Sequence, residues 1–263
     1  MERVNLLISD LDGTLLGDER ALDGFAAWYD QVKSCVRLAY SSGRFLVSIR
    51  ESIDAHNLPE PDAIICGVGT EIHDMAARKR LIGWPRLTYR WNPHIVRETC
   101  VAHHELQVQP EHLLSYYKIS FYGHQLDEMF LVHLIRQLAG VGQDVTVVYS
   151  SNRDLDILPA HTNKGAAAAY LARHWRFRRE QVIVAGDSGN DTEMFRQGFR
   201  GIVVGNAQPE LKSLRDPWVY HASGHFAAGV IEGLRHWLDD FWHSPAISDR
   251  SSWDQDSGRG TPG

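Results

Sequence analysis

The sequence predicts an α/β protein in which a parallel sheet is interrupted by an α+β insertion. Short apolar runs alternate with segments of helical periodicity near both ends of the chain, and this alternation is typical of βαβ units and a parallel sheet. The middle of the chain differs, because two extended runs there are separated by a short polar stretch, as in an antiparallel hairpin. Clusters of Asp, Ser, Lys and Gly follow the predicted parallel strands, where open α/β sheets bind their ligands.

The first third of the chain predicts three strands and two helices. Residues 4–9 are an apolar run with the length of a buried strand, and residues 36–44 and 62–72 are two further strands that run into small polar residues or glycines. Apolar residues recur with helical spacing over 21–33 and 45–58. These elements follow one another in the order that builds a parallel sheet.

The middle segment predicts a smaller α+β unit. Its elements are, in order, a strand, an amphipathic helix and the two strands of a hairpin: residues 118–122, 128–140, 144–151 and 154–160. The hairpin turn is predicted at Asn152 and Arg153. We therefore expect residues 81–159 to form a separate domain that is inserted into the parallel core.

The parallel pattern returns after this insertion. Its elements are, in order, a helix, a strand, a helix and a strand: residues 165–175, 181–191, 191–198 and 201–207. We expect residues 1–80 and 160–243 to form one core domain. Residues 244–263 are rich in Ser, Gly and Asp with few apolar side chains, so we expect this tail to be disordered.

The composition predicts a soluble cytoplasmic protein. Of 263 residues, 43% are hydrophobic and 23% charged, and the net charge of -6 without a Lys/Arg cluster argues against a nucleic-acid partner. No apolar run approaches the roughly 20 residues that span a membrane, and no signal peptide is recognisable. Cys35, Cys66 and Cys100 are odd in number and far apart, which argues against a disulfide framework or a zinc knuckle. We expect a monomer.

The pair Asp10 and Asp12 points to a metal site, a proton-transfer role, or both. Strand side chains alternate, so these two carboxylates face the same side while Leu11 faces the other. Like charges this close are costly unless a cation lies between them or one carboxyl holds a proton. A lone Asp-x-Asp after a strand is more often a turn or a helix cap, so a catalytic role for the pair is supported only when other polar clusters lie at the same site.

The sequence has three more polar clusters that follow predicted strands or precede a helix: SSGR (41–44), NKG (163–165) and GDSGND (186–191). Asp187 and Asp191 are hard oxygen ligands of the kind that magnesium takes. Ser42 offers a hydroxyl and Lys164 a cation for phosphoryl oxygens, although Lys164 alone would be read as a solvated surface residue. Together the clusters describe a magnesium-assisted phosphate site with a carboxylate available as nucleophile.

The four clusters resemble the motifs of the haloacid dehalogenase superfamily. DLDGT (10–14) matches its DxDxT motif, Ser42 its second motif, Lys164 its third, and GDSGND its acidic fourth motif. Further stretches, among them VGTEI, KIS and GNAQPEL, resemble the sucrose-phosphate phosphatase branch along roughly residues 4 to 242, in its compact bacterial form. The resemblance implies a Rossmann-like core with an inserted cap domain of the C2 type.

The resemblance also assigns roles. It implies that Asp10 is the nucleophile and Asp12 the general acid and base, and that Mg²⁺ is the cofactor. The metal ligands would be supplied by Asp10, the Asp12 backbone carbonyl, Asp187 and Asp191, the last directly or through water. Phosphate would be bound by these residues: Thr14, Ser42, Gly43, Lys164 and Asn190.

Substrate choice would come from the cap. Gly69, Thr70 and Glu71 on the core and Lys118 on the cap match sugar-binding positions of the branch, while the plain alternative for Lys118 is a strand residue that faces solvent. The leading expectation is hydrolysis of sucrose 6-phosphate. Mannosylfructose phosphate and other sugar phosphates stay open as substrates, and so does an inactive sugar-binding partner of a glycosyltransferase. A partner of the sucrose-phosphate synthase type is a further expectation.

Overall fold

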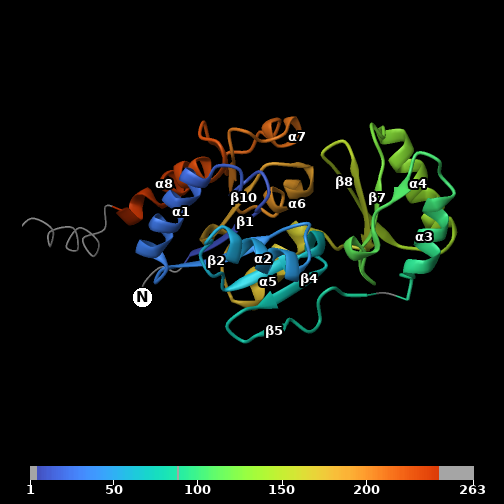
Figure 1. Cartoon of the computed structure of the whole chain (residues 1–263), viewed down its shortest axis with the longest axis horizontal. Coiled ribbons are helices and arrows are strands. Elements are labelled where there is room, and N and C mark those ends of the chain that lie inside the picture. The colour runs from blue at the N-terminus through green and yellow to red at the C-terminus, as the bar shows by residue number, and fades with distance from the viewer. Residues whose placement is uncertain (1–4, 88, 243–263) are drawn as a thin grey trace, which may run out of the picture.

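Two β-sheets organise the computed structural model, which describes residues 5–87 and 89–242 (Figure 1). The larger sheet has the strand order β12-β11-β10-β1-β2-β3-β4-β5. Its strands are β1 (Asn5–Ser9), β2 (Val36–Ser41), β3 (Ala63–Cys66), β4 (Glu71–Asp74), β5 (Lys79–Arg80), β10 (Val182–Gly186), β11 (Arg200–Val203) and β12 (Val219–His221). Neighbours from β12 to β3 pair in parallel, and β4 and β5 add an antiparallel edge. The predicted α/β class with a parallel sheet is confirmed.

Strand β1 lies in the middle of the larger sheet because it is apolar on both faces. All five of its residues are buried, and it pairs with β10 on one side and β2 on the other. Strands buried on both faces are expected to be continuously hydrophobic, as NLLIS nearly is. Because β1 lies in the middle of the sheet, the polar residues that follow it lie at the centre of the carboxyl edge.

Helices cover this sheet. They are α1 (Glu19–Val32), α2 (Leu46–Ala55), α5 (Lys164–His174), α6 (Thr192–Phe195), α7 (Pro209–Lys212) and α8 (Phe226–Trp242). Helix α1 packs against α8, and α5 packs against α6. At the start of α5 the Asn163 side chain accepts a hydrogen bond from the Ala166 amide at 2.7 Å, which is an N-cap interaction. This N-cap interaction fixes the first turn of α5, where Lys164 lies.

The smaller sheet lies within residues 107–159. Its strand order is β6-β7-β9-β8, and all its pairs are antiparallel. The strands are β6 (Gln107–Val108), β7 (Ile119–Tyr122), β8 (Val145–Ser150) and β9 (Asp154–Pro159), and the helices that pack with them are α3 (Pro93–Val101) and α4 (Glu128–Gly140). One sheet face contributes Phe121, Leu155 and Ile157 to a core completed by the helices. The opposite face carries polar residues, which matter for the site below.

Several details differ from the sequence prediction, and helix α3 and the short strands β5, β6 and β12 were not predicted. Residues 62–72 are not one strand, because a turn at Gly67–Gly69 with left-handed residues separates β3 from the antiparallel β4. The β8–β9 hairpin exists, but its loop has three residues, 151–153, rather than two. The C-terminal helix α8 was not predicted. The predicted disordered tail 244–263 lies outside the described residues.

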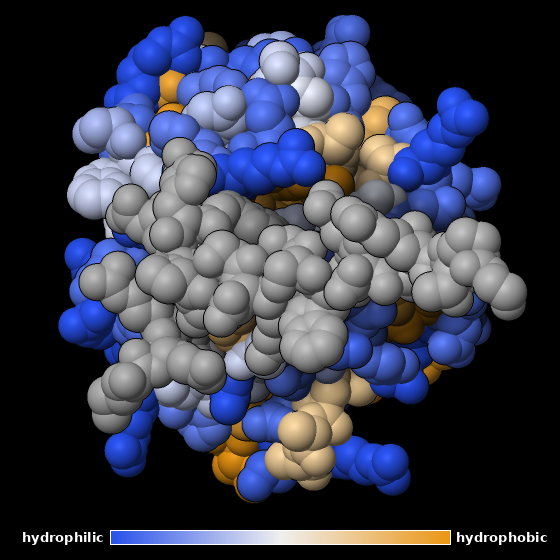
Figure 2. All heavy atoms as spheres, turned by 90° about the vertical axis from the view of Figure 1, so that its left-hand side faces the viewer, coloured by the Kyte–Doolittle hydropathy of each residue, from blue (hydrophilic) through white to orange (hydrophobic). Residues whose placement is uncertain are grey.

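The described surface is largely polar. On the face in Figure 2, the coloured residues are mostly hydrophilic and the hydrophobic side chains form small scattered patches. Cys35, Cys66 and Cys100 are buried, and no disulfide joins them. Within the described ranges, no helix combines the length and the apolar character that crossing a membrane requires.

Candidate active site

The polar clusters converge at the carboxyl edge of the larger sheet. Asp10 follows β1, and its amide donates a hydrogen bond to the Ala185 carbonyl of β10 at 3.0 Å. Ser42 follows β2, and Asp187 follows β10. The capped start of α5 brings Lys164 to the same place. The sheet topology thus explains why residues far apart in sequence form one site.

Lys164 is the centre of this site. Its Nζ lies 2.6 Å from Asp10 Oδ1 and 2.6 Å from Asp191 Oδ1, and the three side chains are almost fully buried. Burial works against the charged form of Lys164, but the two carboxylates raise its pKa above the usual value. Lys164 is therefore a fixed buried cation, not the solvated residue of the plain reading.

Asp187 and Asp191 complete the acidic side of the site. Asp191 Oδ2 accepts hydrogen bonds from the Asp187 and Ser188 amides at 3.1 and 3.2 Å. The Thr14 hydroxyl donates to Asp187 Oδ1 at 3.4 Å. Gly13 has a positive φ of 80°, and a Cβ there would lie 2.4 Å from Asp187 Oδ2. Only glycine allows the β1 loop to approach this carboxylate so closely.

The electrostatics of the cluster fit a divalent cation. Ligand oxygens of Asp10, Asp187 and Asp191 all lie within 4.8 Å of one another. Three carboxylates and one ammonium leave two uncompensated negative charges in a buried place. Burial, followed by the Asp191 charge, raises the pKa of Asp187 to about 7, and burial raises the pKa of Asp10 well above its usual range. Hard oxygen donors with this excess charge suit Mg²⁺.

Asp12 is held apart from that cluster by Arg44. The Arg44 guanidinium donates hydrogen bonds to both Asp12 carboxylate oxygens, from Nε to Oδ2 at 2.8 Å and from Nη2 to Oδ1. Arg44 also donates to Ser52 Oγ of α2 at 2.6 Å. The Asp12 side chain is about half exposed, so it is accessible to a ligand.

The remaining predicted phosphate residues lie on loops of this edge. Ser42 is buried, and its Oγ accepts a hydrogen bond from the Arg44 amide at 3.1 Å. Gly43 is partly exposed. Asn190 is partly exposed and accepts a hydrogen bond from Ser188 Oγ at 3.3 Å. None of the contacts reported for these three includes a carboxylate of the acidic cluster.

The loop of Gly69, Thr70 and Glu71 packs against the start of α5. Gly69 has φ of 92°, and a Cβ there would lie 2.3 Å from the Asn163 carbonyl oxygen. The Thr70 side chain is fully buried, and its hydroxyl has no hydrogen-bond partner in the described structure. Glu71 is partly exposed and is bound by His73 at 2.9 Å and Arg80 at 3.6 Å. Of the sugar-binding residues predicted in this loop, Glu71 alone is accessible.

Lys118 is buried, so its alternative reading as a solvent-facing strand residue is wrong. Its Nζ lies 3.2 Å from Asp156 Oδ1 and 3.2 Å from the Leu113 carbonyl. Asp156 also accepts a hydrogen bond from Ser120 Oγ at 2.5 Å. The Lys118 ammonium lies 5.3 Å from the centre of the Phe45 ring. Phe45 immediately precedes helix α2 of the larger-sheet part of the chain. The polar face of the small sheet is therefore turned toward the core.

Sequence reasoning missed several residues of this region. Arg44 belongs to the SSGR cluster but had no predicted role, and neither had Ser120 or Asp156. Asn206, whose side chain donates to the Gly13 carbonyl at 2.7 Å and accepts from the Phe226 amide at 2.7 Å, was also missed. The GNAQPEL stretch that contains Asn206 was the available signal. Ser120 lies in the KIS stretch and Asp156 in DLDILP (154–159), so the resemblance covered both residues without assigning them a role.

Comparison with known proteins agrees with this geometry. Residues 3–238 match the family model of sucrose-6F-phosphate phosphohydrolase. Mannosylfructose-phosphate phosphatase of Agrobacterium fabrum is 36% identical over 243 residues, covering 90% of this chain and 98% of that protein. Sucrose-phosphatase 1 of Nicotiana tabacum is 33% identical over 88% of this chain, and the match spans 58% of the tobacco protein.

Solved structures agree as well. The sucrose-phosphatase of Synechocystis sp. PCC6803, in complex with sucrose and phosphate, superposes with a TM-score of 0.84 at 34% identity, covering 89% of this chain and 98% of that one. A sugar phosphatase of haloacid dehalogenase subclass IIB, 14% identical, shares the fold with a TM-score of 0.64. The chain is a phosphoric monoester hydrolase of the haloacid dehalogenase superfamily and belongs to the sucrose-6F-phosphate phosphohydrolase family.

Proposed function

We propose that this protein hydrolyses the phosphate ester of sucrose 6-phosphate, with magnesium as cofactor and through a phosphorylated Asp10. The observation that carries the proposal is the buried cluster of Asp10, Lys164, Asp187 and Asp191 at the carboxyl edge of the sheet. The names and functions of its relatives support a sugar phosphate as the substrate. A purely binding or scaffolding role would not need this cluster.

Asp10 is the proposed nucleophile. Lys164 binds Oδ1, which orients the carboxylate and leaves Oδ2 to attack phosphorus in line. Attack forms the Asp10–phosphoryl bond and breaks the bond to the sugar oxygen, and water then hydrolyses the aspartyl-phosphate. Two easier steps replace one difficult hydrolysis.

Asp12 is the proposed general acid and base. It protonates the leaving sugar oxygen and then accepts a proton from the attacking water. A protonated carboxyl carries no charge and accepts the hydrogen bonds of Arg44 more weakly, so this ion pair loosens during the cycle. The exposure of Asp12 and its place two residues after Asp10 suit a proton carrier on the leaving-group side.

Asp10, Asp187 and Asp191 would hold the magnesium ion, together with the Asp12 backbone carbonyl. When bound, the ion neutralises phosphoryl charge and aligns the ester with the nucleophile. Lys164 adds a fixed positive charge beside the reacting group. Ser42, Thr14, Gly43 and Asn190 are the proposed additional phosphate contacts. The loop position of these four is consistent with that role.

Residues 81–159 are the proposed cap that selects the sugar. Lys118, Ser120 and Asp156 form a buried donor and acceptor set on the sheet face that is turned toward the core. Glu71 is the accessible acceptor on the core side. Such buried polar groups discriminate strongly, because a ligand that lacks the matching hydroxyl leaves them unpaired.

A panel of sugar phosphates tests the proposal. Phosphate release in Mg²⁺ should be fastest with sucrose 6-phosphate and absent in Asp10→Asn, which keeps the shape but removes the nucleophile. Preference for mannosylfructose phosphate would select the second candidate, which the Agrobacterium relative favours. Comparable rates on monosaccharide phosphates would indicate a broader phosphatase. Binding of sugar phosphate without any release would indicate an inactive partner of a glycosyltransferase.

A further inference from the structure

A second cluster of metal-binding side chains lies at the antiparallel edge of the larger sheet. The donor atoms of Cys66, Glu71 and His73 all lie within 4.8 Å of one another. Glu71 Oε2 is 2.9 Å from His73 Nε2 and 3.9 Å from Cys66 Sγ. This cluster is separate from the acidic cluster around Lys164 and differs from it in chemistry.

The strand register fixes these three side chains on one face. Glu71 is the cross-strand partner of Cys66 in the β3–β4 pair. His73 follows Glu71 by two residues on β4, so it faces the same side. Residues on paired strands are held more rigidly than residues on loops, and a metal site requires that precision.

The distances suit a tetrahedral ion. With bond lengths of about 2.0 Å to oxygen or nitrogen and about 2.3 Å to sulfur, the donors of a tetrahedral zinc site stand roughly 3.3–3.5 Å apart. The observed separations of 2.9 and 3.9 Å bracket that range, and small side-chain rotations would reach it. Sulfur, imidazole and carboxylate donors favour zinc over magnesium, whereas the all-oxygen cluster favours magnesium.

The surroundings provide further support for a bound ion. Arg80 contacts Glu71 through Oε1 at 3.6 Å, while Oε2 faces His73 and Cys66, so Arg80 can orient the carboxylate without occupying the ligand oxygen. The Leu46 amide hydrogen-bonds the Cys66 sulfur, which stabilises a thiolate. These contacts resemble the outer shell that orients metal ligands in other proteins.

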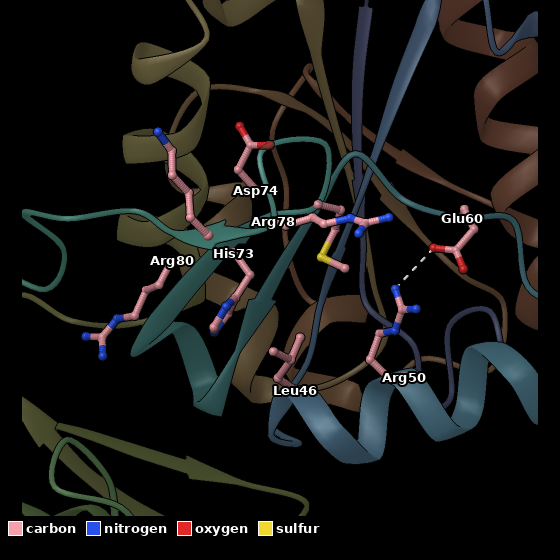
Figure 3. A pocket seen from close by; sticks show the side chains of 9 residues that line it. Leu46, Arg50, Glu60, His73, Asp74, Arg78 and Arg80 are labelled. Carbon is pink, nitrogen blue, oxygen red and sulfur yellow. Dashed lines mark hydrogen bonds and ion pairs between the residues drawn. The ribbon is translucent and has the colours of Figure 1, made fainter.

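A pocket reaches the cluster at His73, while Cys66 and Glu71 lie behind its wall. It has a volume of about 500 Å³ and is lined by His73 and Leu46 among other residues. Figure 3 shows His73 pointing from the β4–β5 hairpin toward Leu46 at the start of α2, with Arg80 directed away from them. The other lining residues include several cations, namely Arg50, Arg78, Lys79 and Arg80. Their charge opposes a metal ion, so the site should bind more weakly than structural zinc sites do.

We propose that Cys66, Glu71 and His73 bind a zinc ion that inhibits the enzyme by withdrawing Glu71 from the sugar. The inhibitory part rests on the proposed function, in which Glu71 accepts hydrogen bonds from the substrate. Binding displaces the Cys66 thiol proton to solvent, and His73 supplies the Nε2 lone pair with its proton on Nδ1. Burial raises the pKa of the Cys66 thiol to about 12, so metal uptake must release a proton at neutral pH.

Cobalt spectroscopy tests the site without any activity measurement. Co²⁺ is titrated into the full chain in saturating Mg²⁺, which occupies the acidic cluster. One equivalent should produce a thiolate-to-cobalt charge-transfer band in the near ultraviolet, and Zn²⁺ should remove it. The band should be lost in Cys66→Ala and weakened in His73→Gln, which keeps a polar side chain at this partly exposed position.

Cys100→Ala is the matched control. Cys100 is as buried as Cys66 and its thiol pKa is also raised to about 12 by burial, but it belongs to no such cluster in the described part of the chain. The band should persist in this variant. A wild-type protein without the band, or a band that survives Cys66→Ala, overturns the metal site.

An activity arm then tests the inhibition. Zn²⁺ should slow hydrolysis of the disaccharide phosphate at least tenfold and leave a small aryl phosphate almost unaffected, because the aryl ester does not use Glu71. Equal inhibition of both esters overturns the assigned mechanism and points to displacement of Mg²⁺. If neither ester is hydrolysed without Zn²⁺, the proposed function fails, and the cobalt band still decides the metal site.

Discussion

Replacing Lys164 with Met should destabilise the protein in a way that magnesium partly reverses. The change keeps the aliphatic stem and removes the ammonium that lies 2.6 Å from both Asp10 and Asp191. The cluster then holds three buried carboxylates without a cation. Removing one partner of a buried ion pair typically costs about 3–5 kcal/mol.

Protonation limits that cost. Burial already raises the pKa values of Asp10 and Asp187, so the variant can take up protons rather than hold three bare charges. We therefore expect the free energy of unfolding to fall by an amount at the lower end of that range, about 3 kcal/mol. For a protein of this size each kcal/mol shifts the melting temperature by roughly 2–4 °C, which gives a decrease of roughly 6–12 °C.

Thermal melts with and without Mg²⁺ provide the assay. The variant cluster is more negative, so it should bind Mg²⁺ more tightly, and Mg²⁺ should raise its melting temperature more than that of the wild type. Turnover should stay lower by orders of magnitude, because Mg²⁺ does not replace the Lys164 contact to the nucleophile. Lys33→Met is the control, since Lys33 and Asp30 form an exposed pair worth less than about 1 kcal/mol. A melting temperature equal to that of the wild type in the absence of Mg²⁺ would refute the reasoning.

Three further predictions concern separate parts of the molecule. Asp187→Asn should move the Mg²⁺ midpoint of activity upward, and an unchanged midpoint would place Asp187 outside the metal shell. Lys118→Met should cost roughly 1–3 kcal/mol in kcat/KM on the disaccharide phosphate and little on a small aryl phosphate; a parallel fall on both esters would place Lys118 in folding or in the phosphate chemistry. Burial is the largest single influence on the pKa of Glu232 and raises it. Hydrogen bonds from the Ser223 and Gly224 amides act in the opposite direction, and the net result is a pKa lowered from 4.5 to about 2. Because the folded pKa is the lower one, its stabilisation is present above about pH 4.5 and is lost as the pH falls toward 2. Glu232→Gln should thus reduce the urea midpoint more at pH 7 than at about pH 4, and an equal reduction at both would contradict this.

Local sequence patterns predicted the parallel core because each of its elements carries its own signal. The run at β1 is continuously apolar, and the first turn of α5 begins after an Asn cap. Parallel strands place their carboxyl ends at one edge whatever their register, so Asp10 and Asp187 could be assigned to one site without coordinates. Lys164 follows β9 of the antiparallel sheet, and its assignment to the same site gained its support from the family resemblance.

The turn between β3 and β4 was missed because it lacks such a signal. The run 62–72 looked like one strand because its apolar residues are continuous, yet left-handed backbone at Gly67, Val68 and Gly69 turns the chain back on itself. Val68 gives no hint of this, because β-branched residues rarely adopt positive φ. Helices α3 and α8 do carry helical signals, which are the Asn92 cap of α3 and the buried Val230 and Leu234 at a spacing of four residues in α8, and these signals were missed.

Antiparallel register explains which functional residues stayed hidden. Ser120 meets Asp156 because β7 and β9 pair in one particular register, and Cys66 meets Glu71 and His73 for the same reason in β3 and β4. A slip of one residue would turn each partner to the opposite face, so neither cluster can be inferred from the spacing of its residues. The parallel edge of the sheet carries the chemistry that sequence motifs reveal. The antiparallel edge and the small sheet carry polar groups that only the structure brings together, and these are the groups through which we expect substrate choice and its inhibition by zinc to act.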